Sequence, residues 1–241
     1  DLKNIEFSKN NKKIISDFNL KIKEGNLYPL VYPQNDQEIK YLFRYLLNLR
    51  GEFKEIDLDK TAFLPEEGGF YPNLTGFEQF DIFEKIYPDF SRVKARDLVY
   101  EFKIPLERKL KKLPDFQRRL IIISAILATK QSLLFLEEPL THLPGGEASL
   151  LQYIFREELK NDRAILLTLS EDKIARYKFD KYFILKKDGI FLINFYGFKD
   201  QTYKLALNHG KKLNKEETYV IPGEKFHPNF EKKVPDYTAH F

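Results

Sequence analysis

The sequence predicts an α/β fold built on a mostly parallel sheet. Short apolar runs at 27–32, 133–136 and 164–169 alternate with stretches of helical periodicity. Near-continuous apolar runs of this kind are typical of parallel strands covered on both faces. With 241 residues, 43% of them hydrophobic, the chain is long enough to bury such a core.

The N-terminal residues predict a small antiparallel β subdomain. Residues 5–7 and 18–22 alternate apolar and polar side chains, and a polar turn at 10–13 joins them. The apolar run 27–32 then predicts a buried strand. After it come a polar loop and a helical stretch at 39–49, for which Gly51 is a plausible C-cap.

The middle of the chain predicts a strand followed by an inserted helical subdomain. The apolar run 61–64 precedes a loop, and residues 74–112 have helical periodicity that Pro88 and Pro105 interrupt. We place the helical subdomain at about 74–116. The next expected elements are a buried helix at 120–128, a strand at 133–136, an amphipathic helix at 147–159 and a strand at 164–169.

The C-terminal part predicts a short helix at 174–177 and then a hairpin. Its strands, 182–185 and 190–194, flank the turn 186–189. Beyond it the chain is richer in Lys, Asn, Gly and Pro, with weak strand patches at 202–207 and 218–221. We therefore expect one domain over 1–197 and a peripheral extension over 198–241.

Composition excludes several classes of function. There is no cysteine, so disulfides, thiolate metal sites and thiol nucleophiles are excluded. The formal net charge is +4 and is spread along the chain, which excludes a strongly basic nucleic-acid binder and leaves anionic surfaces as weak partners. No apolar run reaches the roughly 18 residues that a spanning helix requires, and residues 1–4 do not resemble a secretory signal. These features predict a soluble, cytoplasmic protein.

Two carboxylates follow the strand predicted at 133–136. Glu137 and Glu138 would lie at the carboxyl end of a parallel strand, where acids can hold Mg²⁺ and polarise water. The alternative is that the pair is only an acidic turn that ends the strand.

Several stretches, taken in order, resemble the ATP-binding subunit of ABC transporters from about Leu2 to Leu192. Residues 18–25 resemble the strand and glycine before the phosphate loop, and 62–75 the segment with the Q-loop. The stretch 133–143 resembles the Walker B and D-loop region, 164–170 the strand that ends at the switch histidine, and 186–189 the late hairpin turn. The resemblance implies a P-loop NTPase-like fold that binds ATP and Mg²⁺ and associates with a permease.

The phosphate loop is where the chain departs most from that family. The family loop uses glycines to wrap the phosphates, a lysine for their charge and a hydroxyl for Mg²⁺. Counted on from Gly25, Glu38 stands at the lysine position and Ile39 at the hydroxyl position. Like charges about 4 Å apart repel by roughly 4 kcal/mol at an effective dielectric of 20, so Asp36 and Glu38 disfavour a triphosphate. The degenerate Walker A positions are Gln34, Asn35, Gln37, Glu38, Ile39 and Lys40.

The remaining motif positions are also altered. Pro114 and Gln117 take signature-loop positions, with Pro114 in place of the serine that contacts the γ-phosphate. The resemblance carries over the following roles: Glu66 at the Q-loop glutamine, Glu137 on the metal side of Walker B, Glu138 as general base, Pro144 at the D-loop aspartate and Ser170 at the switch histidine.

These departures favour a degenerate subunit of a membrane transport complex with a structural or regulatory role. We expect it on the inner face of the cell membrane, partnered by an integral-membrane permease and forming a homodimer or a heterodimer with another ABC ATPase subunit, without nucleic acid. One rival is an active ATPase with an atypical site, in which Glu138 is the base and Lys40 is borrowed for phosphate. A second rival is a soluble scaffold protein.

The remaining candidate residues are not expected to take part in catalysis or metal binding. The four histidines, His142, His209, His227 and His240, lack metal-ligand spacing and are expected on the surface. The basic runs 109–112 and 118–119 are expected as solvated helix ends that could meet an acidic partner or lipid headgroups. Any exposed aromatic side chains within 70–90 would suit a docking surface.

Overall fold

A computed structural model describes much of the chain. The described residues are 2–9, 12–32, 60–171, 173, 177, 179, 181–186, 189–194 and 218–220. The helix expected at 39–49, the Walker A positions 34–40 and the strand patch at 202–207 lie outside them, as does most of the short helix expected at 174–177.

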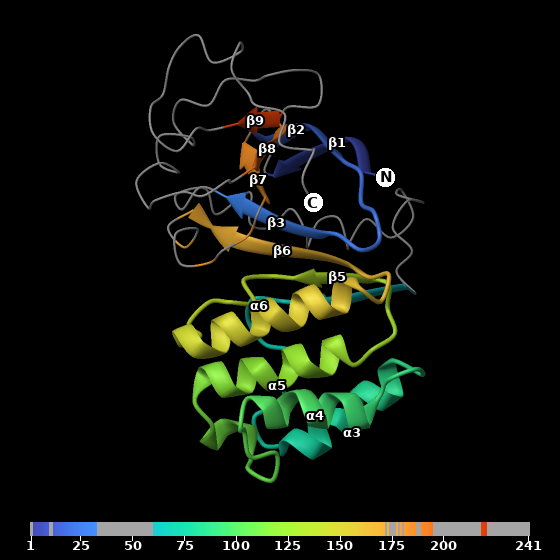
Figure 1. Ribbon diagram of the computed structural model, residues 1–241, viewed down its shortest axis with the longest axis vertical. Helices are drawn as coiled ribbons and strands as arrows, with labels where there is room; N and C mark the ends of the chain where they lie inside the picture. Colours follow the sequence, from blue (N-terminus) through green and yellow to red (C-terminus); the bar gives the residue numbers. More distant parts are fainter. Residues whose placement is uncertain are drawn as a thin grey trace, which may run out of the picture.

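The core of the fold is a seven-stranded, mostly parallel sheet, as the sequence predicts (Figure 1). Its strand order is β4-β5-β6-β3-β7-β8-β9, and neighbouring strands are parallel except for the antiparallel pair β7–β8. The strands are β3 (Leu27–Tyr32), β4 (Thr61–Leu64), β5 (Leu133–Leu136), β6 (Ala164–Ser170), β7 (Lys181–Lys186), β8 (Gly189–Asn194) and β9 (Thr218–Val220). β9 belongs to the predicted C-terminal extension, yet it pairs with β8 and so adds a strand to this sheet.

The antiparallel N-terminal unit is confirmed as a separate two-stranded sheet. β1 (Leu2–Lys9) pairs with β2 (Lys12–Leu20). β2 ends two residues before the end that the alternating pattern predicted. The chain then turns through Gly25, whose φ of 71° suits a residue without a Cβ and whose N–H donates to the Arg163 carbonyl at 3.0 Å. That bond ties the entry of β3 to the start of β6.

The stretch with helical periodicity contains two helices with side-chain caps. α3 (Gly76–Ile86) begins after Thr75, whose hydroxyl accepts from the Glu78 N–H while the Glu78 carboxylate accepts from the Thr75 N–H. α4 (Arg92–Glu101) begins after Ser91, whose hydroxyl accepts from the Lys94 N–H at 3.2 Å. A single 3₁₀ turn, η2 (Leu110–Lys112), follows α4.

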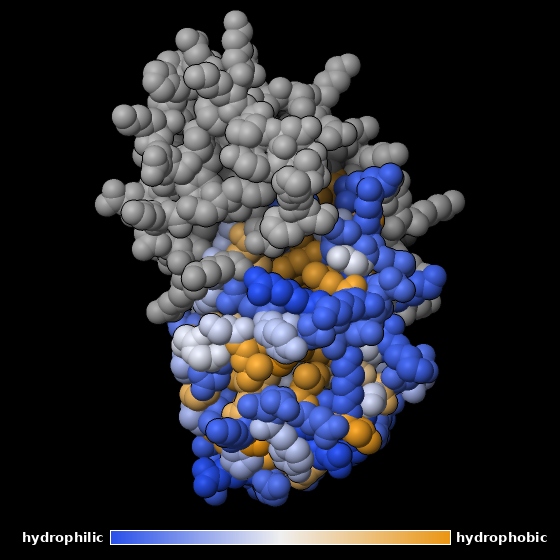
Figure 2. Space-filling view, in the orientation of Figure 1, coloured by the Kyte–Doolittle hydropathy of each residue, from blue (hydrophilic) through white to orange (hydrophobic). Residues whose placement is uncertain are grey.

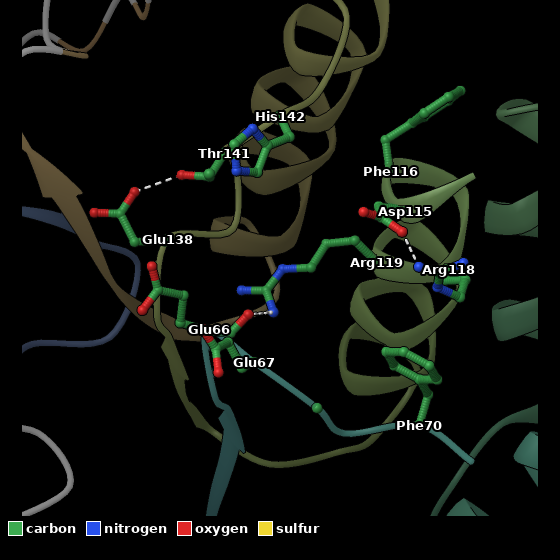
Figure 3. Close-up of a pocket in the computed structure, with 11 residues that line it drawn as sticks. Glu66, Glu67, Phe70, Asp115, Phe116, Arg118, Arg119, Glu138, Thr141 and His142 are labelled. Atoms are coloured by element: carbon green, nitrogen blue, oxygen red, sulfur yellow. Dashed lines mark hydrogen bonds and ion pairs between the residues drawn. The ribbon is translucent and has the colours of Figure 1, made fainter. Parts of the chain in front are cut away.

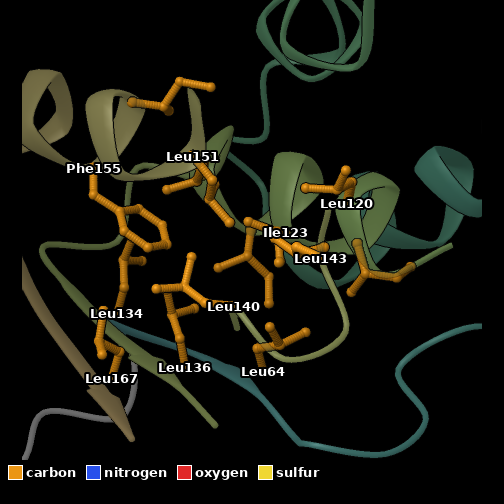
Figure 4. Packing of buried hydrophobic residues seen from close by; sticks show 14 of the residues in the cluster. Leu64, Leu120, Ile123, Leu134, Leu136, Leu140, Leu143, Leu151, Phe155 and Leu167 are labelled. Carbon is orange, nitrogen blue, oxygen red and sulfur yellow. The ribbon is translucent and has the colours of Figure 1, made fainter. Parts of the chain in front are cut away.

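Two further helices join this pair to the sheet. α5 (Asp115–Leu127) lies between α6 (Gly145–Leu159) and the α3–α4 pair (Figure 1). Side chains from β4, β5, β6, α5 and α6 meet in the main core (Figure 4), which includes Leu64, Ile123, Leu136, Phe155 and Leu167. The predicted start of α5 at 120 is wrong, because the helix begins at Asp115 with a turn whose single apolar residue, Phe116, sets no apolar period.

The surface of the helical part is mostly polar, although the apolar side chains of Tyr71, Ile86, Val93 and Tyr100 are exposed there. In the view of Figure 2, hydrophilic residues predominate over the end of the molecule that holds α3 and α4. Of the aromatic residues within 70–90, Tyr71 is 59% exposed, whereas Phe80 and Phe83 are buried in the core. No helix in the described part of the chain is both long and apolar enough to cross a bilayer.

Candidate functional site

The predicted site residues converge where four parallel strands end. Tyr32, the last residue of β3, is paired in register with Ser170, the last residue of β6. β4 and β5 end side by side at Leu64 and Leu136. Glu137 and Glu138 follow β5 directly, so the structure places both carboxylates at this end of the sheet, where α/β folds bind ligands.

Glu138, at the general-base position, is fully buried and held on both carboxylate oxygens. The Tyr32 hydroxyl donates to Oε1 at 2.5 Å, and the Thr141 hydroxyl donates to Oε2 at 2.5 Å. The Lys173 ammonium also reaches Oε2, at 3.0 Å, and Thr141 Oγ1 at 2.9 Å. Among the described residues, the Glu138 carboxylate therefore has two hydroxyls and one cation as partners.

The backbone of Glu138 is equally constrained. Its φ is 49°, which lies in the left-handed region that non-glycine residues seldom adopt. Its N–H donates to Thr168 Oγ1 on β6 at 3.0 Å. Strain of this kind persists where the surrounding contacts over-determine a conformation, and here it directs the carboxylate toward Tyr32 and Lys173.

Glu137, at the metal-side position, faces a different set of groups. The Glu66 N–H donates to Glu137 Oε2 at 2.9 Å, and the Glu137 N–H donates to the Leu64 carbonyl at 2.9 Å. These bonds join the ends of β4 and β5. Within the described part of the chain, no three His, Asp or Glu side chains converge as a metal site would require.

Arg119 connects the same loops from α5. Its guanidinium donates to the carbonyls of Pro65 at 2.6 Å and Glu66 at 2.7 Å, and also to the Glu137 carbonyl. Burial lowers the pKa of Arg119 to about 10, although the negative charges of Glu66, Glu137 and Glu138 act to raise it. The prediction that 118–119 are solvated helix ends is therefore wrong for Arg119.

A cavity of about 300 Å³ opens beside these residues (Figure 3). The residues after β4, the first turn of α5 and the loop after Glu138 line it. Arg118 lies 5.3 Å from the centre of the Phe70 ring and pairs with Asp115, while its Nε is buried with no hydrogen-bond partner. The lining residues are Glu66, Glu67, Gly68, Phe70, Asp115, Phe116, Arg118, Arg119, Glu138, Thr141 and His142.

The structure brings together some of the predicted site residues and leaves others undescribed. Glu66, Glu137, Glu138 and Ser170 cluster at the end of the sheet. Pro114 is the exposed N-cap residue of α5, and its carbonyl accepts from the Gln117 N–H at 3.0 Å. The predicted Walker A positions Gln34, Asn35, Gln37, Glu38, Ile39 and Lys40 are not among the described residues. Of the four histidines only His142 is described, and it is exposed.

Three residues of the site had no signal in the sequence. Thr141, Lys173 and Tyr32 were not singled out as contacts, and Arg119 was noted only as part of the basic run 118–119. Tyr32 and Glu138 are 106 positions apart, so their contact depends on the pairing of β3 with β6. Spacing could not have shown it.

Two curated proteins of Bacillus subtilis (strain 168) resemble the chain. ABC transporter ATP-binding protein YtrB is 26% identical over 107 residues, which span 44% of this chain and 37% of that protein's length. An uncharacterized ABC transporter ATP-binding protein, YthP, is 24% identical over 193 residues, 75% of this chain and 80% of its own length. No protein-family model matches the chain.

The fold has solved relatives. A dimeric structure of the ATP-binding cassette MJ0796, in a post-hydrolysis state bound to ADP and Pi, superposes with a TM-score of 0.62 at 15% identity. The match covers 81% of this chain and 98% of that one. A putative ABC transporter ATP-binding protein from Pyrococcus furiosus gives a TM-score of 0.60 at 16% identity, covering 70% of this chain and 90% of that one. The α/β architecture is thus that of P-loop ATP-binding cassettes.

Proposed function

We propose that the chain, which resembles the ABC transporter ATP-binding proteins of Bacillus subtilis, is a degenerate member of that family with a structural or regulatory role in a membrane transport complex. In this proposal it lies on the cytoplasmic face of the membrane, where it associates with a permease and with a second ATP-binding subunit, either a copy of itself or a different chain. It does not supply the energy of transport by hydrolysing ATP.

The observation that carries the proposal is that both carboxylate oxygens of Glu138 already accept hydrogen bonds from other side chains. A general base needs a carboxylate oxygen that can accept a proton from the attacking water. Here one oxygen accepts from Tyr32, and the other accepts from Thr141 and Lys173. These contacts support a role for Glu138 other than that of a general base.

The altered motifs support the same conclusion from the sequence. Glu38 at the lysine position and Ile39 at the hydroxyl position remove the groups that would hold the phosphates and Mg²⁺. Pro114 removes the serine that the family offers across a dimer, and its ring carries no N–H for an anion at the start of α5. Both composite sites of a symmetric dimer would therefore lack phosphate contacts.

Equilibrium titration with a fluorescent ATP analogue, together with phosphate release, tests the proposal. We expect no Mg²⁺-dependent binding below millimolar analogue and no phosphate release above background. Micromolar binding that is lost in Lys40→Ala, with turnover that is lost in Glu138→Gln, would overturn the proposal in favour of the active ATPase. Lys160→Ala, at an exposed helix end, is the control.

The scaffold alternative is tested by the partner. Purification of the full chain from its own cells in mild detergent is expected to recover a polytopic membrane protein. Recovery of the chain without any membrane partner, at the same detergent concentration that preserves an authentic transporter complex, would favour the soluble scaffold.

A further inference from the structure

One exposed segment concentrates positive charge. Between residues 103 and 112 the chain has five basic residues against one acidic residue, and all six are exposed. Its excess of positive charge equals the formal net charge of the whole chain, +4. We call this the basic segment. Its charged residues are Lys103, Glu107, Arg108, Lys109, Lys111 and Lys112.

Buried leucines hold the basic segment against the helical part of the fold. Leu106 and Leu110 are fully buried, and Leu113, just beyond the segment, is 3% exposed. The apolar residues therefore anchor the segment, while its basic residues point outward. The backbone is fixed as well, since Leu110 N–H donates to the Leu74 carbonyl at 2.7 Å and Lys111 N–H to the Pro72 carbonyl at 2.8 Å.

A close backbone contact fixes the segment further. Gly76 N–H donates to the Leu106 carbonyl at 2.9 Å, and a Cβ at position 76 would lie 2.4 Å from Leu106 Cδ2. The positive charges are thus presented by a preorganised surface. The Pro72 carbonyl accepts from the Lys111 N–H, and the residue before it, Tyr71, is 59% exposed. An exposed amphipathic side chain therefore belongs to the loop that is hydrogen-bonded to the basic segment.

Nearby carboxylates do little to neutralise this charge. Asp115, at the start of α5, pairs with Arg118. Glu78 accepts hydrogen bonds from Thr75 at the start of α3, although its charge also acts on Lys109. Glu107 is the one acidic residue within the segment. The basic side chains therefore keep a net positive field toward solvent.

We propose that the basic segment binds the anionic headgroups of a lipid bilayer. Four of its five basic residues are lysines, which are point charges rather than the planar forks that recognise one carboxylate or phosphate. Their exposed, outward arrangement suits a diffuse negative surface, and an exposed tyrosine suits the headgroup level. This contact goes beyond the proposed function, because it needs neither a nucleotide nor a permease.

Co-sedimentation of the full chain with phospholipid vesicles tests the contact. We expect the chain to bind vesicles of phosphatidylcholine with about 30% phosphatidylserine, to ignore pure phosphatidylcholine, and to dissociate at about 1 M salt, where the Debye length falls to about 3 Å. Lys109→Ala/Lys111→Ala/Lys112→Ala should weaken partitioning roughly 100-fold, since each basic residue near such a surface contributes about one kilocalorie per mole.

A matched triple substitution separates this surface from overall charge. Lys85→Ala/Lys130→Ala/Lys160→Ala removes the same charge from exposed positions elsewhere and should retain binding. Equal loss in both triple variants, binding that does not distinguish the two vesicle types, or no binding by the parent would overturn the proposal. The assay contains no nucleotide, so its failure leaves the proposed function standing. Nucleotide binding in the titration above would likewise leave the lipid contact standing.

Discussion

The ion pair between Lys173 and Glu138 gives the sharpest prediction. Lys173→Met removes the cation and leaves the fully buried carboxylate with the Tyr32 and Thr141 hydroxyls as its remaining partners among the described residues. Breaking a buried pair by removing one partner costs about 3–5 kcal/mol. Because the Lys173 side chain is 24% exposed and two hydroxyls remain, we expect a loss of about 2 kcal/mol in the free energy of unfolding.

A double-mutant cycle isolates the pair. Glu138→Gln alone should cost about 1 kcal/mol, because Lys173 keeps Thr141 Oγ1 and some water. The combined variant contains no unpaired buried charge and should therefore be less destabilised than the sum of the two, by about 1–2 kcal/mol. Urea unfolding at neutral pH, with equal m-values, measures each term.

The same cycle can refute this reasoning. Additivity within about 0.3 kcal/mol would mean that Lys173 and Glu138 do not interact. Lys160→Met is the control: its partner Glu157 lies at 2.7 Å, but the Lys160 side chain is 70% exposed, so the unfolding midpoint should not move.

Three further predictions concern stability and the loops around the site. Gly76→Ala should lower the free energy of unfolding by about 1–3 kcal/mol, since its Cβ would overlap Leu106. Gly145→Ala is the control and should not destabilise the fold, because the space around Gly145 is open. Equal melting temperatures for the two variants would contradict the close contact at Gly76. The Thr75 hydrogen bonds lower the pKa of Glu78 below its ordinary 4.5. Glu78→Gln should therefore have a lower unfolding midpoint than the parent at pH 7, and the difference should vanish as the pH falls through the folded-state pKa. A difference in midpoint that persists below that pKa would contradict this charge effect. Arg119→Lys should speed proteolysis after residues 65–67, because a lysine ammonium lacks the planar fork whose two Nη atoms donate to these three carbonyls. An unchanged cleavage rate would show that other contacts hold this loop.

Much of the sheet could be predicted because its strands are short apolar runs between polar residues. β3, β4 and β5 have the bounds that those runs predicted, and β6 is one residue longer. Helix starts were harder. α5 and α6 begin after Pro114 and Pro144, in first turns that hold too few apolar residues to show a period.

The site was predictable only in part. Order along the chain placed Glu137 and Glu138 after a strand and Ser170 at the end of another, and the structure confirms these places. The partners of Glu138 could not be predicted, since they depend on a left-handed backbone at that residue and on the register of β3 against β6. The contacts of Arg119 could not be predicted, because two adjacent basic residues, 118–119, at the expected start of a helix are usually exposed to solvent. Whether 74–116 behaves as a separate subdomain, and where the C-terminal extension begins, stay predictions.

A crystal structure of the full chain grown with Mg²⁺ and a non-hydrolysable ATP analogue tests the central claim most directly. We expect no phosphate density beside residue 38, and a Glu138 carboxylate that keeps Tyr32, Thr141 and Lys173 as its partners. A seated triphosphate, with Glu138 released from Lys173 and turned toward a water in line with the γ-phosphate, would contradict the account.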